Sequence, residues 1–375
     1  MTKAAELAKM GEVLDNSQIG RKNIIINGAM QIAQRSTSET GLGAASGYFT
    51  LDRYYMVEND ASAGRFTMSQ SAVTDLEGFS NALKIDCTTA DTSIAAGEAL
   101  IIQYRGEGFD CQQLKATSTT TRAFTLSFYA KSNASRAIAS EINFSNGTNK
   151  SASKLHTIGT SWARYTMTVP AASSTQIDND NSHELSVNLW LHAGTTFSSG
   201  TMSASLEPIT NANRAVGIGS IFASTDNEIE ITGIQLEVGS QATPFEHRSF
   251  GEEQRLCQRY AIVYSKNGQP NMGQKAIGTG ASTNSSGAYQ AFIFPQVTMR
   301  AVPTLTVGGS VSDYEILKYE TGFVDLNSSI SLYSASGRSL FVLAISSATA
   351  EAERGRDVIM RLEGDNSSLL FDAEL

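Results

Sequence analysis

Short segments in which apolar and polar residues alternate are the feature that most constrains how this chain can fold. Apolar residues take every second position in 83–87, 124–130, 165–169 and 185–191. Successive side chains of a strand point to opposite faces, so each segment predicts a strand with one buried and one solvated face. Turn clusters such as 145–149 and 193–196 separate the segments. Many short strands between turn clusters predict a β-sandwich.

The strand expected around residues 229–238 changes phase at its centre. Ile229 and Ile231 are apolar at odd positions, whereas Ile234 and Leu236 are apolar at even positions. A one-residue slip would turn the second half of the strand to the opposite face of its sheet. An extra residue in a β-bulge restores both halves to the core, and glycine suits a bulge. We therefore predict a bulge at Thr232–Gly233.

The remaining patterns divide the chain into four parts. Residues 1–20 are expected to be a helical docking segment, because apolar residues at 7, 10 and 14 follow helical spacing. Such a short helix is marginal alone, so it would form against copies of itself or a partner; a frayed terminus is the alternative. Residues 21–248 are expected to form the β-sandwich and 265–375 a smaller β domain. Between them, a capping-box pattern from Ser249 to Glu252 predicts a connector helix within 249–264.

The C-terminal part contains one segment that is apolar on both faces. Residues 340–345 read Leu-Phe-Val-Leu-Ala-Ile. Alternation is lost when a strand is buried on both faces, so this segment predicts a central strand or a subunit contact.

Charge and composition exclude several classes of partner. The chain has 28 Lys+Arg against 37 Asp+Glu, a net charge of −9. This balance argues against binding to nucleic acid, whose affinity comes mainly from basic side chains on phosphates, and against binding to an anionic membrane surface. The sequence contains no run of 18 apolar residues, so we expect no membrane insertion. No apolar core of a secretory signal is visible at the N-terminus.

The cysteines do not suggest a disulfide framework or a zinc site. Cys87, Cys111 and Cys257 are few and scattered, and no two form a C-x-x-C pair. We expect them to be small buried apolar residues of a protein made in a reducing cytoplasm.

Searches for catalytic, cofactor and metal motifs fail. The chain has no nucleophile elbow, no Walker A loop and no complete dinucleotide loop. Residues 178–182 begin like a calcium loop, but His183 replaces the glycine and Leu189 the glutamate that such a loop needs, which predicts a solvated loop. Carbonyls and scattered carboxylates of a β-sandwich can still hold a structural Ca²⁺ ion. We therefore predict no catalytic residues, no cofactor, no motif-based metal ligands and no enzymatic activity.

One strand carries candidate ligand-binding residues. Ser186, Asn188, Trp190 and His192 share the face of the 185–192 strand that is expected to be solvated. An aromatic ring flanked by hydrogen-bonding side chains is what a sugar needs, because the ring covers the apolar C–H face and the neighbours pair with hydroxyls. The alternative is that Trp190 is covered by a loop, a neighbouring strand or another subunit.

Other aromatic residues are expected to be structural. Trp162 begins a strand and is interpreted as a core anchor. Tyr54 and Tyr55 are adjacent, so they point to opposite faces and one of them should lie in the core.

Several motifs resemble those of a family of bacteriophage virion proteins. Residues 23–35 are similar to its opening "NxxINGAMxxxQR", and Asp52-Arg53-Tyr54 matches its "DRW/DRY" element. The longest match is 231–240, followed by 242–249 and by Cys257-Gln-Arg-Tyr260. The ending 371–375 is also similar. The central motif looks structural, because Gln235–Glu237 lies on the strand with the expected bulge and Pro244–Glu246 leads into the connector.

This resemblance implies the fold and the setting of the protein. The fold would be all-β: a jelly-roll β-sandwich similar to carbohydrate-binding modules, then a second smaller β domain, with a short N-terminal helix. Such proteins are usually homotrimers. They are made in the host bacterial cytoplasm and displayed on the virion surface, with the N-terminal segment bound to other virion proteins. The family offers no catalytic residues to carry over.

Three functional hypotheses follow. The first is a virion protein of the tail fibre or spike type that binds host surface glycans as a homotrimer. The second is a purely architectural role as a capsid decoration, head-fibre or tail adaptor protein. The third is a polysaccharide depolymerase, which needs two carboxylates at a separation that only a structure shows. The host, the sugar, the location on tail or head and the recognising domain stay open, since the loop 280–287 is a second candidate.

Overall fold

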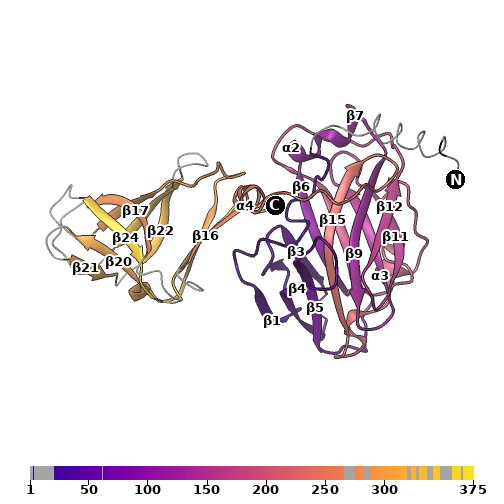
Figure 1. Ribbon diagram of the computed structural model, residues 1–375, viewed down its shortest axis with the longest axis horizontal. Coiled ribbons are helices and arrows are strands. Elements are labelled where there is room, and N and C mark those ends of the chain that lie inside the picture. Colours follow the sequence, from indigo (N-terminus) through magenta and orange to yellow (C-terminus); the bar gives the residue numbers. More distant parts are fainter. Residues whose placement is uncertain are drawn as a thin grey trace. The chain divides into compact units, whose positions relative to one another are not determined.

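A computed structural model describes residues 3, 21–60, 62–265, 275–282, 288–318, 322–326, 329–335, 341–346, 357–364 and 366–375 (Figure 1). The chain divides into one unit of Met1–Glu253 with Leu375 and a second unit of Gln254–Glu374. The helix expected near the N-terminus lies outside the described residues, as do residues 283–287 of the loop 280–287.

The first unit contains two antiparallel sheets packed as a sandwich, which confirms the predicted jelly-roll fold (Figure 1). One sheet has the strand order β1 (Ser38–Leu42), β4 (Arg65–Ala72), β5 (Asn81–Thr89), β15 (Glu228–Val238), β9 (Phe124–Ser132) and β12 (Ala163–Val169). The other has the order β14 (Glu207–Pro208), β11 (Lys150–Ile158), β10 (Arg136–Phe144), β13 (His183–Ala193), β6 (Ala99–Glu107), β3 (Tyr54–Asn59) and β2 (Gly47–Tyr48).

Short elements lie between these strands. They are α2 (Gly108–Cys111), η1 (Gln112–Leu114), β7 (Lys115–Thr117), β8 (Thr120–Thr121), α3 (Thr195–Ser198), η2 (Asn211–Asn213) and η3 (Ile221–Ala223). Two of them, α3 and η2, belong to the segment 194–220 that leads from β13 toward β15.

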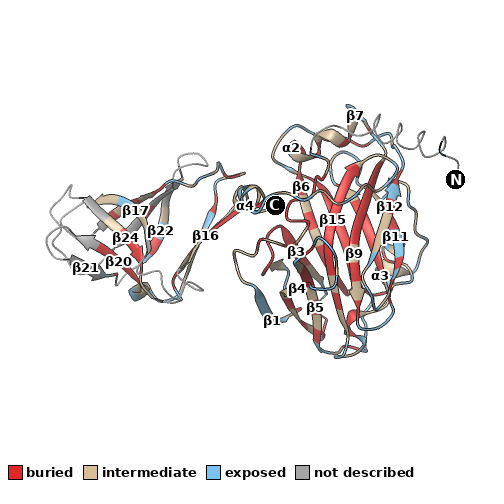
Figure 2. Ribbon diagram, viewed as in Figure 1, coloured by how far each residue is buried: buried red, intermediate tan, exposed pale blue. Residues whose placement is uncertain are grey.

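The core lies between the two sheets and is made by every second residue of their strands (Figure 2). Phe124 on β9 meets Phe144 on β10 with their ring centroids 6.0 Å apart, which joins the two inner faces. Tyr54 is 1% exposed whereas Tyr55 is half-buried, which confirms that one of this pair is core. The three cysteines are buried and free, as expected.

The predicted bulge is confirmed in β15. Its pairing with β9 runs in register to Thr232, shifts, and resumes at Gln235. Gly233 has φ of +60°, and a Cβ added there would lie 2.8 Å from atoms of both Phe79 and Tyr129. Both the left-handed backbone and the crowding therefore require glycine at this position.

The N-terminal apolar run at 24–26 is buried but forms no regular strand. It lies beside the bulged strand, where Ile24 N–H donates to the Leu236 carbonyl at 3.0 Å and Ile234 N–H donates to the Gly28 carbonyl at 2.9 Å. The Asn23 side chain supplies hydrogen bonds to β15 that backbone groups of a regular strand would otherwise make. Its Nδ2 donates to the Ile234 carbonyl at 3.1 Å and its Oδ1 accepts from Leu236 N–H at 3.1 Å.

The motif residues at 27–52 make a buried polar turn. Asn27 Nδ2 donates to the carbonyls of Ile32 at 2.8 Å and Asp52 at 3.0 Å, and Asn27 Oδ1 accepts from Ile32 N–H at 2.9 Å. The Asp52 carboxylate accepts from Gln34 N–H at 2.9 Å. These bonds satisfy buried backbone groups that no strand pairs, so the motif has a structural role.

The central motif closes on the same region. The Glu237 carboxylate accepts from Thr243 N–H at 2.8 Å and from Gln235 Nε2 at 2.8 Å. Glu246 N–H donates to Gln235 Oε1 at 2.8 Å, and the Glu246 carboxylate accepts from the backbone N–H of Asn23 at 2.6 Å. The two motifs, far apart in the sequence, thus form one hydrogen-bonded network at one end of β15.

The second unit is also all-β. It contains a sheet of β16 (Ala261–Ser265), β25 (Ser368–Asp372) and β19 (Thr304–Gly308). A larger sheet has the order β21 (Gly322–Asp325), β20 (Tyr314–Lys318), β24 (Asp357–Leu362), β17 (Lys275–Ser282), β18 (Ala288–Ile293), β23 (Phe341–Ser346) and β22 (Ile330–Ala335), with η4 at Val311–Asp313. β23 lies between two other strands, as the apolar segment 340–345 predicts for a central strand.

The helix α4 (Phe250–Gln258) begins where the capping pattern predicts. Glu252 N–H donates to Ser249 Oγ at 3.4 Å, which supplies the serine half of the cap. None of the helices in the described ranges is long and apolar enough to cross a membrane.

Candidate functional site

Strand β13 lies at the middle of the seven-stranded sheet and organises its outer face. Leu185, Val187 and Leu189 alternate toward the core, so Ser186, Asn188 and Trp190 point to the outer face. Register places Asn188 between Glu141 of β10 and Gln103 of β6. Polar and aromatic side chains from several strands are therefore neighbours on this face.

The prediction that the candidate sugar-binding residues lie on a solvent-exposed face is wrong. Trp190, Asn188 and His192 are 0% exposed and Ser186 is 4% exposed, so a sugar cannot reach them. The alternative, a covering loop, is what the structure shows. The segment 194–220 lies over this part of the sheet and buries the outer face of β13, whose inner face already lies in the core.

Apolar contacts and backbone hydrogen bonds hold the covering segment in place. The Phe197 ring lies 5.3 Å from the Trp190 ring, and Met202, Ala215 and Ile218 pack in the same cluster. Gly194 N–H donates to the Glu98 carbonyl at 2.8 Å. Trp190 is therefore an anchor of the cover and not a binding platform.

Glu141 is a buried carboxylate beneath this cover, and its charge is fully paired. It accepts hydrogen bonds from Trp190 Nε1 at 2.9 Å, from Asn188 Nδ2 at 2.9 Å and from Arg214 Nε at 2.7 Å and Nη2 at 3.0 Å. The Arg214 guanidinium also lies 4.8 Å from the Trp190 ring centroid. A buried charge needs such partners, because desolvation without them is very costly.

A chain of hydrogen bonds leads from Glu141 to the uncovered part of the face. Asn188 Oδ1 accepts from Gln103 Nε2 at 2.9 Å, and Gln103 Oε1 accepts from Arg105 Nε at 2.6 Å. We call Glu141, Asn188, Gln103 and Arg105 the polar ladder. It crosses from β10 through β13 to β6, continues along β6 from Gln103 to Arg105, and passes from full burial to half-burial.

The ladder ends against aromatic rings of β3 and β2. The Arg105 guanidinium lies 3.9 Å over the Tyr55 ring, and the Tyr48 ring meets Tyr55 edge to face at 4.9 Å. Gln103, Arg105, Tyr55 and Tyr48 are each half-buried and form what we call the open end of the ladder. Their side chains are ordered by one another and still reach the surface.

Two donors at the open end converge on one acceptor. The backbone carboxyl oxygen of Leu375, a residue grouped with the first unit, accepts from Arg105 Nη1 and from Tyr48 Oη, the latter at 3.4 Å. The open end can therefore bind an oxygen acceptor.

The other two predicted residues do not join the ladder. His192 bonds Glu98 Oε2 at 3.1 Å and Ser220 Oγ at 2.8 Å, and burial lowers the pKa of this histidine. Ser186 Oγ bonds His183 Nε2 at 2.9 Å. Only Asn188 of the predicted set connects to the open end.

The residues that sequence reasoning missed had a readable signal. β6 begins with an apolar run that includes Leu100–Ile102. Gln103 and Arg105 then stand at alternate positions of the same strand. Polar residues at alternating positions in a strand that neighbours Asn188 indicate the same outer face.

The outer face of the six-stranded sheet has a different character. Trp162, expected to be a core anchor, is half-buried and packs beside the Phe79 cluster. Its Nε1 donates to Asp75 Oδ1 at 2.8 Å, and Lys131 Nζ lies 5.0 Å from its ring centroid. Lys131 in turn pairs with Asp75 at 3.0 Å. The polar groups around this ring are thus engaged with one another.

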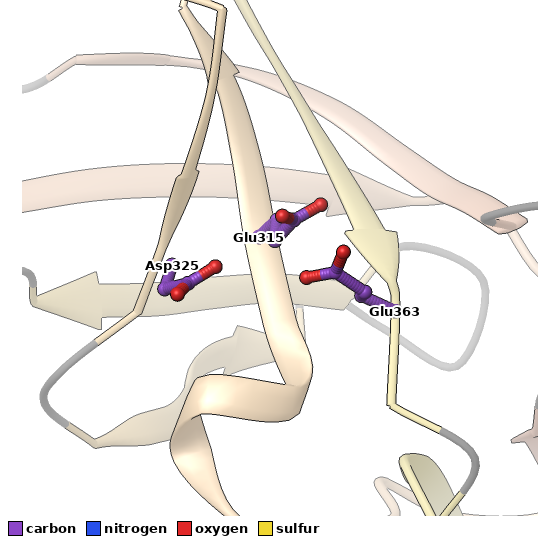
Figure 3. A group of neighbouring side chains, drawn as sticks. All are labelled: Glu315, Asp325 and Glu363. Carbon is purple, nitrogen blue, oxygen red and sulfur yellow. The ribbon is translucent and has the colours of Figure 1, made fainter.

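Two acidic groups bear on metal binding and hydrolysis. Carboxylate oxygens of Glu315, Asp325 and Glu363 lie within 4.8 Å of one another (Figure 3). Glu315 is already paired with Arg361, which neutralises part of that charge. In the predicted solvated loop, Asp180 caps its own turn by accepting from Ser182 N–H at 2.9 Å. We assign neither metal binding nor catalysis to either of these groups.

Comparison with known proteins gives distant structural similarities. No family model matches the chain and no curated protein matches it. An enzymatically active domain of tailspike protein 4 from bacteriophage CBA120 aligns at 13% identity and TM-score 0.29, covering 58% of this chain and 21% of that chain. TmCBM61 in complex with β-1,4-galactotriose aligns at 8% identity and TM-score 0.29, covering 58% of this chain and 100% of that one.

A family 11 carbohydrate-binding module from Clostridium thermocellum aligns at 12% identity and TM-score 0.28, covering 55% of this chain and 98% of that one. The chain thus spans about a fifth of the tailspike domain's length and nearly all of each module's. TM-scores this far below 0.5 do not define the function of this chain.

Proposed function

We propose that this protein is a bacteriophage virion protein of the tail fibre or spike type that binds host surface glycans without cleaving them. The glycan site would be the open end of the polar ladder. The observation that carries this assignment is the chain of hydrogen bonds that holds Gln103 and Arg105 in place beside the Tyr55 ring. Ordered polar groups beside aromatic rings match the mixed apolar and hydroxyl surface of a sugar.

The virion setting is supported by the sequence resemblance at 23–35, 52–54 and 231–260. The structure gives these motifs a physical role, because their polar side chains form the network at one end of β15. Residues needed for folding in this way are expected in related chains whatever sugar each one binds. The binding residues would then lie outside the shared motifs, as Tyr55, Gln103 and Arg105 do.

We further propose a homotrimer that is displayed on the virion surface and joined to other virion proteins by residues 1–20. Binding at each glycan site would be weak. Three sites on one fibre raise the overall affinity through effective concentration without any new contact.

Binding to an array of bacterial surface glycans tests the proposal. The wild-type protein should bind at least one glycan class, and Tyr55→Ala should weaken that binding about tenfold, which corresponds to about 1.4 kcal/mol. Trp162→Ala, on the other sheet, is the matched aromatic control and should bind as the wild type does. No binding to any glycan at high protein concentration would contradict the proposal, and loss of binding in the control alone would move the site to the other face.

The purely architectural role is a second candidate. It is favoured by the burial of the strand residues that looked most suited to a sugar. An image reconstruction of the particle separates the two roles. A receptor-binding protein should have the open end facing outward, whereas a decoration or adaptor protein should have it covered by other virion proteins.

A further inference from the structure

Within the described residues some arginines of the sandwich pair with a carboxylate side chain, whereas Arg105, like Arg65, Arg136 and Arg164, has no such partner. Arg214 pairs with Glu141 and Arg248 pairs with Glu253. Within the ranges that the structure describes, Arg105 contacts Gln103, the Tyr55 ring and the backbone carboxyl oxygen of Leu375, and no ion pair joins it to an acidic side chain.

The guanidinium is also held ready for a ligand. Its Nε donates to Gln103 Oε1 at 2.6 Å, and its Cζ lies 3.9 Å from the centroid of the Tyr55 ring. Its Nη2 makes no hydrogen bond within the described residues. Stacking and a fixed Nε reduce the rotamer freedom that an arginine loses on binding, and the guanidinium edge matches the two oxygens of a carboxylate.

The acceptor already present at this position has the required geometry. The accepting oxygen belongs to the backbone carboxyl group of Leu375, the last residue of the sequence, and it accepts from both Arg105 Nη1 and Tyr48 Oη. A ligand carboxylate in the same place would accept the same two hydrogen bonds, and hydrogen bonds between ionised groups are roughly twice as strong as neutral ones.

We propose that the open end of the polar ladder binds the carboxylate of an acidic sugar, such as a uronic acid unit of a bacterial polysaccharide. This inference rests on the glycan-binding function proposed above and names its ligand class. Arg105 and Tyr48 bind the carboxylate, and Gln103 and the Tyr55 ring position Arg105. A ligand carboxylate displaces the Leu375 oxygen when it binds.

An array of matched neutral and uronic-acid oligosaccharides, such as galactotriose and the galacturonic acid trimer, tests the inference. The wild-type protein should bind acidic members at least tenfold more tightly than their neutral counterparts, and this preference should fall as salt is added. Arg105→Gln should abolish the preference, and Arg105→Lys should keep part of it because the charge remains. Removing Leu375 should tighten binding to acidic members, because the competing acceptor is gone.

Lys131→Gln is the matched control, because it removes one positive charge from the other sheet and should leave the preference unchanged. Thermal unfolding of each variant shows that it is folded. Equal binding of neutral and acidic members, preference for sulfated or phosphorylated glycans over uronic acids, or a preference that survives Arg105→Gln would overturn this inference while leaving glycan binding intact. Binding to no member at all would instead overturn the proposed function.

Discussion

At the scale of single residues, the β-sandwich contains buried charged side chains that are held by specific partners. Glu141 is fully buried, yet it is paired with Arg214 and bonded to Trp190 and Asn188. It is therefore a fixed, fully buried first member of the polar ladder. Sequence alternation indicates that such residues share a face, but it does not show whether that face is covered.

Glu184 is a second buried carboxyl group, and it makes stability depend on pH. Burial raises the pKa of Glu184 to about 7. The charges of Asp178 and Asp180 act in the same direction, whereas hydrogen bonds from the Asp178 backbone and the Asn146 side chain oppose the rise. The folded protein therefore holds a proton that the unfolded chain releases above about pH 4.5. The stability contributed by this group is complete below that pH and is lost as pH rises through 7.

Glu184→Gln should remove this dependence, because the amide does not titrate. Between pH 5 and pH 8 the wild type should lose on the order of 1–3 kcal/mol more stability than the variant does. Urea unfolding at each pH measures the difference. Glu207→Gln, on the exposed strand β14, is the control and should follow the wild type. Parallel profiles for Glu184→Gln and wild type would contradict the assignment.

At the scale of elements, the bulge in β15 determines how the two motifs meet. The register shift after Thr232 keeps both halves of the strand in the core and brings Ile234 and Leu236 beside the segment 23–28. The bulge was predictable because it follows from the phase of apolar residues along one strand. The irregular course of residues 24–26 was not, because it depends on side-chain bonds from distant residues.

Gly233→Ala should destabilise the first unit. The new Cβ would be strained by the φ of +60° and would lie 2.8 Å from Phe79 and Tyr129. We expect a loss of about 2–4 kcal/mol in the free energy of unfolding. Gly41→Ala is the control, since its φ is +72° and nothing lies within 4 Å of the added Cβ, so it should cost about 1 kcal/mol. Equal losses in the two variants would show that crowding at the bulge is not significant.

The covering segment 194–220 marks the limit of sequence reasoning about the site. The strand 183–193 is predicted by alternation, which is a local pattern. Its cover is held by contacts between distant residues, such as Phe197 with Trp190 and Gly219 N–H with the Ala137 carbonyl. No periodicity in 194–220 indicates which face it covers. Alternation therefore predicts that Ser186, Asn188 and Trp190 share the outer face, but it does not predict that this part of the face is buried.

At the scale of the whole molecule, the proposed homotrimer needs surfaces through which copies of the chain can associate. The larger sheet of the second unit ends in β21 and β22, and Phe294 and Val302 of that unit are 69% and 59% exposed. Sheet edges and apolar side chains of this kind favour association with other chains. Light scattering should give a mass near three times the 40.1 kDa chain. A monomer over the full range of protein concentration would contradict the proposed homotrimer.

The most direct test of the central claim is hydrogen exchange of the full-length protein with and without a saturating glycan identified by the array. The account predicts that added protection concentrates in β3 and β6, the strands that carry Tyr55, Gln103 and Arg105. Protection confined to β9 and β12 of the opposite sheet, or to the second unit, would show that the ladder is a structural feature and that the glycan binds elsewhere.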